Sequence, residues 1–525
     1  MNPIKTALRL TLAVAASLVV EDALAQSTEC PSVAARPGQR YLVAISDLHF
    51  GLGRRSGGAW DPREDFRWSG ALRGFLDRIS RCGADRVDLV VAGDMLELWQ
   101  PPDSIECVGA RDDLGCTLEQ MTRITQAVTA AHTDDLKALG RFASRGDNHL
   151  FLVPGNHDAA LLLEGPWQLV HAAMEASANR ATRVDSGVWV SPDGKVVIEH
   201  GHQIGQDVNN FAKWPAITER IDGVDYLVRP WGERFVQKIF NEQELVYSII
   251  DNLSPEAAGV RYRMADRGLW SSIDDLARFL AFNVFETSLA QKAQFLGGNQ
   301  DPNAPPPPWD LKIGRGFGHL LFVDALPVDD PFRASLLADT PESSKLRTAL
   351  DAMARDENRL TDAEVEMLCD QIAIRTSGKR RCQDESLGAL AQQLLRSKRA
   401  VLTEHLQGRL AQSGLRQMRV FVYAHTHELE EAWPVQVTDL RSVMVLNTGA
   451  FQRVINEDGF LSRAKAKNLP PAEALRQLTP EDLPPCYTAV VVAFGDALPE
   501  AQTVRWHMEE GKPGGFVNVG NAACN

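Results

Sequence analysis

The sequence predicts an α/β protein in which short buried strands carry polar residues at their carboxyl ends, interrupted by a mostly helical insert. Short runs of Val, Ile and Leu end abruptly in Asp, His or Asn, and amphipathic stretches lie between the early runs. A long segment with helical periodicity separates the early runs from the late ones. In layered α/β folds, ligands bind at the carboxyl ends of the strands. We therefore expect the polar strand ends to form one site.

The N-terminal segment has the composition of a secretory signal peptide. Lys5 and Arg9 precede a short apolar stretch that begins at Leu10, and small residues around Ala25 offer a cleavage site before Gln26. The stretch is short for a membrane span, although an uncleaved anchor or a buried helix is the alternative. No later stretch is long and apolar enough to cross a bilayer. We expect residues 1–25 to be removed near Ala25, leaving a soluble periplasmic or extracellular protein without a transmembrane segment.

Eight cysteines fit an oxidising compartment, because an even number is what disulfide pairing requires. Cys107 with Cys116, and Cys369 with Cys382, each enclose a short polar loop, and we expect both pairs to form local disulfides. The pairing of the other four stays open: Cys30, Cys82, Cys486 and Cys524. No Cys-x-x-Cys motif occurs, so we do not expect a thiolate zinc site.

The composition excludes one broad class of function. The 525 residues carry a formal net charge of -14, whereas proteins that grip nucleic acid backbones do so mainly with Lys and Arg. We therefore expect no specific nucleic acid partner. A small phosphate ester remains compatible with this charge, because bound cations can supply positive charge locally.

Six apolar runs predict strands that are buried on both faces and end in polar residues. They are Arg40–Gly51, Arg86–Trp99, His149–Asp158, Lys195–Gln203, Arg419–Glu428 and Ser442–Phe451. The amphipathic stretch Gly70–Gly83, between the first two runs, predicts a crossover helix.

Between the fourth and fifth runs, residues 215–414 predict a mostly helical insert. Thr361 and Glu364 have capping-box spacing, and a long amphipathic run ends at Gly414. The insert divides the core into residues 26–214 and 415–525. Its place between two polar strand ends suggests a lid over the site, whereas a purely structural domain or an interaction module fits the sequence equally well.

Five short motifs at the strand ends supply the ligands of a metal centre. They are Asp47-x-His49, Gly93-Asp94, Gly155-Asn156-His157, His200-Gly201-His202 and His425-x-His427. Mixed carboxylate oxygen and imidazole nitrogen suit manganese, iron, zinc or cobalt better than magnesium or calcium. A single motif of this kind is weak evidence, but five motifs in order at the ends of apolar runs are improbable by chance.

The motifs SDLH, GDMLE, GNHD, HGH and AHTH together resemble the five motifs of the calcineurin-like metallophosphoesterase superfamily. The resemblance covers the core on both sides of the insert. It implies a four-layer α/β/β/α sandwich with two divalent or trivalent metal ions at its strand ends. Ala424 stands where the family usually has glycine, and Glu97 replaces the commoner aspartate.

The resemblance also implies a role for each motif residue. The first ion would be held by Asp47, His49 and His427, with Asp94 bridging to a second ion that Asn156, His200 and His425 complete. A hydroxide bridging the ions would attack phosphorus. His157 would act as the catalytic partner of the leaving group, oriented by Glu97.

The substrate is less constrained by the sequence. His202, Asn209, Arg54 and Arg55 follow the motifs closely enough to be candidates for substrate contact. The acidic chain and the large insert favour a phosphodiester, either a small molecule or a lipid-like compound. The alternatives are a phosphomonoesterase or nucleotidase with the same site, and a non-catalytic protein that binds a phosphate ligand or a partner.

Overall fold

The computed structural model describes most of the predicted core and parts of the predicted insert. The described residues are 28–33, 35–205, 209–254, 259, 262–263, 330–338, 340–355, 360–377, 398–438, 441–493, 498–521 and 524. The predicted signal peptide, residues 1–25, lies outside them. All six predicted strand runs contain a strand, and the mixed α/β class is confirmed.

A seven-stranded sheet carries the first three motifs. Its order is β17 (Gly515–Val517), β16 (Glu500–His507), β15 (Cys486–Ala493), β1 (Tyr41–Ile45), β2 (Val87–Ala92), β4 (His149–Val153) and β5 (Ala181–Arg183). The strands β1, β2, β4 and β5 are parallel, whereas β15 pairs antiparallel with β1. The carboxyl ends of β1, β2 and β4 therefore lie at one edge of the sheet.

A five-stranded sheet carries the other two motifs. Its order is β12 (Leu429–Thr438), β13 (Arg441–Thr448), β11 (Val420–Tyr423), β7 (Val196–Glu199) and β6 (Val188–Val190). The strands β7, β11 and β13 are parallel. Leu42 and Val90 of the first sheet share a buried apolar cluster with Val422 and Leu446 of the second. The two sheets therefore pack face to face through alternate side chains of their strands.

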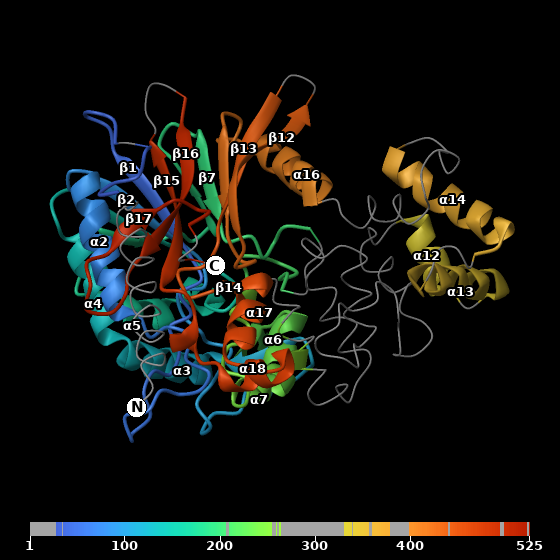
Figure 1. Ribbon diagram of the computed structural model, residues 1–525, viewed down its shortest axis with the longest axis horizontal. Helices are drawn as coiled ribbons and strands as arrows, with labels where there is room; N and C mark the ends of the chain where they lie inside the picture. The colour runs from blue at the N-terminus through green and yellow to red at the C-terminus, as the bar shows by residue number, and fades with distance from the viewer. Residues whose placement is uncertain are drawn as a thin grey trace, which may run out of the picture.

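Helices cover the outer faces of both sheets (Figure 1). The seven-stranded sheet packs against α2 (Ser69–Cys82), α3 (Leu118–Ala131), α4 (Thr133–Ala143) and α5 (Glu164–Met174). On α2, which was the predicted crossover helix, Leu72, Phe75 and Ile79 recur at helical spacing and are fully buried. The five-stranded sheet packs against α16 (Lys398–Ala411) through Leu402 and Leu406.

The two ends of the predicted insert pack with the core. At its start, β8 (Thr218–Ile221) and β9 (Val224–Val228) form a hairpin that pairs with β3 (Leu114–Thr117). The hairpin turn, Asp222–Gly223, has φ values of 49° and 85°, which is the left-handed conformation that Asp-Gly favours in two-residue loops. These strands lie at the start of the predicted, mostly helical insert, and α16, near its end, belongs to the face of the second sheet.

The remaining elements form smaller groups. A cluster beside the sheets contains α6 (Trp231–Phe235), a π-helical turn (Val236–Phe240), α7 (Asn241–Glu244), β10 (Leu253–Ser254), β14 (Ile455–Asn456), α17 (Glu457–Ala466) and α18 (Pro471–Gln477). Short 3₁₀ turns occupy Ala159–Leu162 and Pro480–Asp482. Within the predicted insert, α13 (Pro341–Arg355) packs against α12 (Pro331–Leu337) and α14 (Asp362–Ser377), and these three lie to one side of the sheets in Figure 1. The role of a lid stays a prediction.

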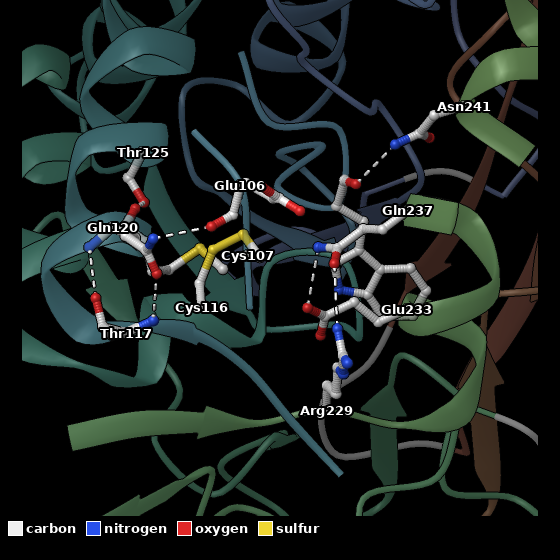
Figure 2. Close-up of a disulfide and its surroundings, with 12 residues drawn as sticks. Glu106, Cys107, Cys116, Thr117, Gln120, Thr125, Arg229, Glu233, Gln237 and Asn241 are labelled. Atoms are coloured by element: carbon white, nitrogen blue, oxygen red, sulfur yellow. Dashed lines mark hydrogen bonds between the residues drawn. A yellow bond between two sulfur atoms is a disulfide. The ribbon is translucent and has the colours of Figure 1, made fainter. Parts of the chain in front are cut away.

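Three disulfides join described residues. The predicted Cys107–Cys116 bond forms just before α3, whose first turn carries a capping box between Thr117 and Gln120 (Figure 2). The pairs that the sequence left open are Cys30–Cys82 and Cys486–Cys524. Cys382, the expected partner of Cys369, lies outside the described residues. Among the helices that the structure describes, none combines the length and apolar composition that crossing a bilayer requires.

We expect the Cys30–Cys82 bond to stabilise the protein more than the Cys107–Cys116 bond. The first closes a sequence separation of 52 residues and the second only 9. In the chain-entropy account, removal costs about 4 kcal/mol for the first and about 2.5 kcal/mol for the second. Urea unfolding of the two double Cys→Ser variants under oxidising conditions measures this difference. Equal losses for both variants would contradict the entropic account.

Candidate metal centre

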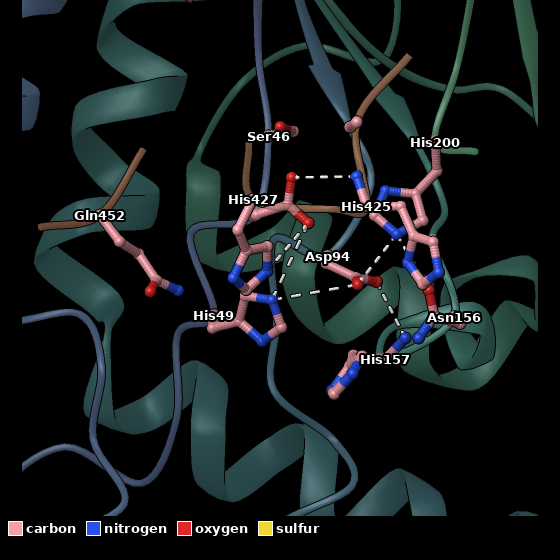
Figure 3. A network of polar contacts seen from close by, with 12 residues as sticks. Ser46, His49, Asp94, Asn156, His157, His200, His425, His427 and Gln452 are labelled. Carbon is pink, nitrogen blue, oxygen red and sulfur yellow. Dashed lines mark hydrogen bonds and ion pairs between the residues drawn. The ribbon is translucent and has the colours of Figure 1, made fainter. Parts of the chain in front are cut away.

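The five motifs meet where the parallel strands of both sheets end. Asp47 follows β1, Asp94 follows β2 and Asn156 follows β4 in the first sheet, while His200 follows β7 and His425 follows β11 in the second. Figure 3 shows Asn156, His200 and His425 gathered around Asp94. Parallel pairing and face-to-face packing therefore bring together residues that lie far apart along the chain.

Three groups of these residues have ligand atoms within 4.8 Å of one another. The groups are Asp47 with His49 and His427, Asp94 with His200 and His425, and His49 with Glu97 and His157. The first two bring together residues that the sequence analysis assigned to the same metal ion, whereas Asn156 is in neither group. That amide is also in place, because Asn156 Oδ1 lies 2.9 Å from His200 Nε2.

In the first group, the ligand atoms are too far apart for hydrogen bonds but suitably placed to share an ion. Asp47 Oδ1 lies 3.5 Å from His427 Nε2 and 4.0 Å from His49 Nε2. Two atoms that are each about 2.1 Å from one ion lie roughly 3 to 4 Å apart. Asp47 Oδ1 and His49 Nε2 are buried and have no hydrogen-bond partner among the described residues. Such orphaned acceptors fit a bound cation.

In the second group, three acceptors converge on one point. His200 Nδ1 lies 2.9 Å from the carbonyl oxygen of Ala92, which can only accept, so this nitrogen carries the proton. The lone pair of His200 Nε2 then faces Asp94 Oδ2 and Asn156 Oδ1, each 2.9 Å away. Only a cation, either a metal ion or a second proton on the imidazole, relieves this convergence.

Asp94 reaches both groups with one oxygen atom. Asp94 Oδ2 lies 2.9 Å from His200 Nε2 and 3.9 Å from His49 Nε2, while Oδ1 accepts a hydrogen bond of 2.8 Å from the His157 backbone N–H. This position suits the bridging role that the resemblance implies.

The electrostatics of the centre favour ionised carboxylates. Burial opposes ionisation of Asp94, but the nearby His200 and His157 hold its pKa well below the usual value. Burial also opposes ionisation of Asp47, but the nearby His427 imidazole lowers its pKa overall. Burial lowers the pKa of His200, yet the Asp94 carboxylate raises it overall to about 9. The pocket therefore holds buried negative charge that requires positive partners.

The backbone is strained at the same positions. Five candidate ligands have positive φ: Asp47 (51°), His49 (48°), Asp94 (49°), His425 (75°) and His427 (54°). The left-handed conformation is uncommon for residues other than glycine and costs on the order of 1–3 kcal/mol at each position. The described chain has ten such residues, and half of them are these ligands. Strain concentrated in this way is typical of a functional site.

Glycines allow the motifs to approach each other. A Cβ on Gly93, where φ is 95°, would lie 2.3 Å from His200 Nδ1. A Cβ on Gly155 would lie 2.2 Å from Asp94 Oδ1. The first residue of each of these two motifs must therefore be glycine, because the ligands pack closely against it.

Glu97 connects His157 with a candidate ligand. Its Oε2 lies 2.5 Å from His157 Nδ1 and 2.9 Å from His49 Nδ1, and its Oε1 accepts a hydrogen bond of 2.8 Å from the Trp99 backbone N–H. Although burial opposes it, the charge of His157 lowers the pKa of Glu97 to about 2. An ionised carboxylate only accepts, so both imidazoles donate from Nδ1 and present Nε2 to the site.

Trp99 contacts the candidate catalytic pair, and the sequence analysis did not single it out. Its indole stacks on the ring of His157, with centroids 3.9 Å apart and an interplanar angle of 26°. The indole is nearly buried, with 3% of its surface exposed. Its place two residues after Glu97, in a motif already singled out, was the available signal.

Glu199 and Asp158 hold the motif loops in place through hydrogen bonds. Glu199 immediately precedes His200 and accepts hydrogen bonds from His405 and Arg409 of α16. Asp158 accepts from the backbone N–H groups of Gly155 (2.7 Å) and Met95 (2.8 Å), which fixes two motif loops relative to each other.

The predicted substrate contacts differ in where they lie. His202 is buried against Trp214 and close to His200, with ring centroids 4.4 Å and 5.4 Å away. Asn209 Nδ2 lies 3.5 Å from His425 Nε2. The structure therefore brings both residues to the edge of the second group.

The two predicted arginines are not brought to the centre. Arg54 stacks on Trp60 at 3.8 Å and donates to the Gly58 carbonyl, and Arg55 donates to Asp61. Both arginines therefore contact residues of their own loop, the Trp60 ring and the Asp61 carboxylate, rather than the candidate ligands.

Comparison with known families agrees with this arrangement. Residues 41–290 match the family model of calcineurin-like phosphoesterase. The matched segment contains the first four motifs, and His425 and His427 follow beyond it. A search of curated proteins found no match. The match over residues 41–290 supports the metallophosphoesterase superfamily that the motifs resemble.

Proposed function

We propose that the protein is an exported phosphoesterase that uses two metal ions to hydrolyse a phosphodiester. The observation that carries this proposal is the position of Asp94, whose Oδ2 lies near both His200 of one ligand group and His49 of the other. The family match and the ligand groups support a metal-dependent phosphoesterase. The three disulfides support export.

In this proposal the seven ligands would hold the ions as the resemblance implies. Asp47, His49, Asp94 and His427 would form one site, and Asp94, Asn156, His200 and His425 the other. When bound, the ions would offset the charge of the phosphoryl oxygens and lower the pKa of water.

His157 would serve the leaving group. Because Nδ1 donates to Glu97, the second ring nitrogen is the atom that can carry a proton toward a leaving-group oxygen. The side chain of His157 is 16% exposed, more open than Glu97 at 2%, so the substrate can reach it. Trp99 and Glu97 would restrict the ring to one orientation.

The acidic composition of the chain supports a diester rather than a monoester, because the formal net charge is -14. A monoester dianion would meet more repulsion from this charge than the single charge of a diester.

We expect the manganese-loaded protein from Gln26 onward to hydrolyse bis(p-nitrophenyl) phosphate with a higher kcat/KM than p-nitrophenyl phosphate. The single charge of the diester is the physical reason. Release of p-nitrophenolate, measured for both substrates with the same preparation, tests this prediction. Faster turnover of the monoester would reverse the assignment, and turnover of neither with metal bound would support a binding protein.

Replacing His157 with alanine is expected to lower kcat for the diester by about 10²- to 10⁴-fold without loss of bound metal, because the leaving group loses its proton donor. His149→Ala is the matched control. This histidine lies at the opposite end of β4, where its Nδ1 is 3.3 Å from Asp88. Metal content by mass spectrometry accompanies the kinetics. Equal losses in both variants would remove His157 from the chemistry.

Glu97→Gln is expected to weaken metal binding by about 10- to 100-fold and to lower kcat. The carboxylate accepts three N–H groups, so whichever way the new amide turns, its NH₂ faces a donor. Glu97→Asp keeps the charge and is the control. Titration with manganese measures the affinity, and an unchanged affinity would mean that Glu97 does not support His49.

A further inference from the structure

A polar pocket lies beside His427, outside the candidate ligand groups. It has a volume of about 250 Å³, and Gln452, Thr488 and Arg505 line it together with His427. Figure 3 shows Gln452 on the His427 side of the centre. Pockets that hold a whole small ligand are typically about 300–1,000 Å³, so this one is suited to a part of a larger molecule.

The pleat of the first sheet explains which side chains face the pocket. Thr488 on β15 pairs with Arg505 on β16, so the two side chains lie on the same face of the sheet. Val490 and Val492, two and four residues along β15, belong to the core between the two sheets. Thr488 and Arg505 therefore also face the second sheet, at the end of the sheet packing where His427 lies.

Two buried side-chain nitrogen atoms in this pocket lack hydrogen-bond partners among the described residues. Gln452 is 2% exposed, and its Nε2 has no hydrogen-bond partner among the described residues. Its Oε1 accepts from Asn252 at 3.2 Å. Arg505 Nε is also buried without a partner, while the terminal nitrogen of Arg505 donates to the Cys524 carbonyl at 2.8 Å.

Arg505 has no ion-pair partner within the described part of the chain. Burial lowers the pKa of its guanidinium. Glu428 also lines the pocket. A half-buried guanidinium without a carboxylate partner is costly, and an oxyanion placed against it would make charge-assisted hydrogen bonds.

We infer that this pocket binds an anionic arm of the substrate, a carboxylate or a second phosphate, while the reacting phosphate lies at the ligand groups. The inference rests on the proposed function and narrows its substrate to a phosphodiester with a further oxyanion on one arm. Arg505 would pair with the oxyanion and Gln452 would donate to it. The pocket is the part of the site that distinguishes a charged arm from a neutral one.

The test compares two p-nitrophenyl phosphodiesters, one with a carboxyalkyl arm and one with an alkyl arm of equal length. We expect the manganese-loaded wild type to prefer the carboxyalkyl ester in kcat/KM. Arg505→Gln should reduce this preference by about 10- to 100-fold, which corresponds to a hydrogen bond with a charged group. Arg505→Lys should retain part of it.

Two further variants separate the pocket from general effects on folding. Gln452→Glu introduces a repelling charge without touching Arg505 and should also abolish the preference. Arg441→Gln is the matched control, because Arg441 likewise has a buried unpartnered Nε and donates to a backbone carbonyl, that of Met418. It does not line this pocket and should leave the preference unchanged.

Loss of the preference in Arg441→Gln, or no preference in the wild type, would overturn the inference. If the wild type cleaves neither ester, the proposed function fails. The pocket is then tested separately, by measuring how tightly the matched non-hydrolysable phosphonates bind to the metal-loaded protein. Tighter calorimetric binding of the carboxyalkyl phosphonate, lost in Arg505→Gln, would support the inference by itself. Equal binding of both phosphonates would refute it.

Discussion

Around Asp94, carboxylate oxygens, an amide oxygen and imidazole lone pairs converge in a space that is largely closed to water. His200 shows the constraint most directly, because its Nδ1 proton is committed to the Ala92 carbonyl and its Nε2 faces only acceptors. Such an arrangement is stable only with positive charge at its centre. The left-handed backbone of the ligands and the glycines packed against them serve the same convergence, since each costs stability without another benefit.

Glu97 extends this constraint from metal binding to catalysis. One carboxylate oxygen receives hydrogen bonds from both His49 and His157, so the tautomers of a ligand and of the proton donor depend on the same group. Trp99 holds that carboxylate through its backbone and holds the His157 ring through its indole. On the opposite side, Glu199 connects α16 with the strand that carries His200. The helix α16, at the end of the predicted insert, is thus hydrogen-bonded to the residue next to a candidate metal ligand.

The sequence predicted that the strand ends meet, because an apolar run that ends in polar residues indicates a buried strand of a parallel sheet with a site at its carboxyl end. The residues that the sequence analysis missed act through contacts that no local pattern encodes. Stacking of Trp99 on His157 depends on how β2 and β4 pair, and the clamp on Glu199 depends on where α16 packs. The Asp222–Gly223 turn has residue types that favour a two-residue hairpin loop, but the sequence analysis did not single it out. Arg54 and Arg55 followed the first motif in sequence, yet Trp60 and Asp61 offered them closer partners.

The central claim is that Asp94 joins two metal sites at these strand ends. Electron paramagnetic resonance of the manganese-loaded protein tests it most directly, because two ions that share a bridging carboxylate are magnetically coupled. We predict two ions per chain with a coupled spectrum, and an uncoupled spectrum or a single ion in Asp94→Asn. A single, uncoupled ion in the wild-type protein would contradict the account.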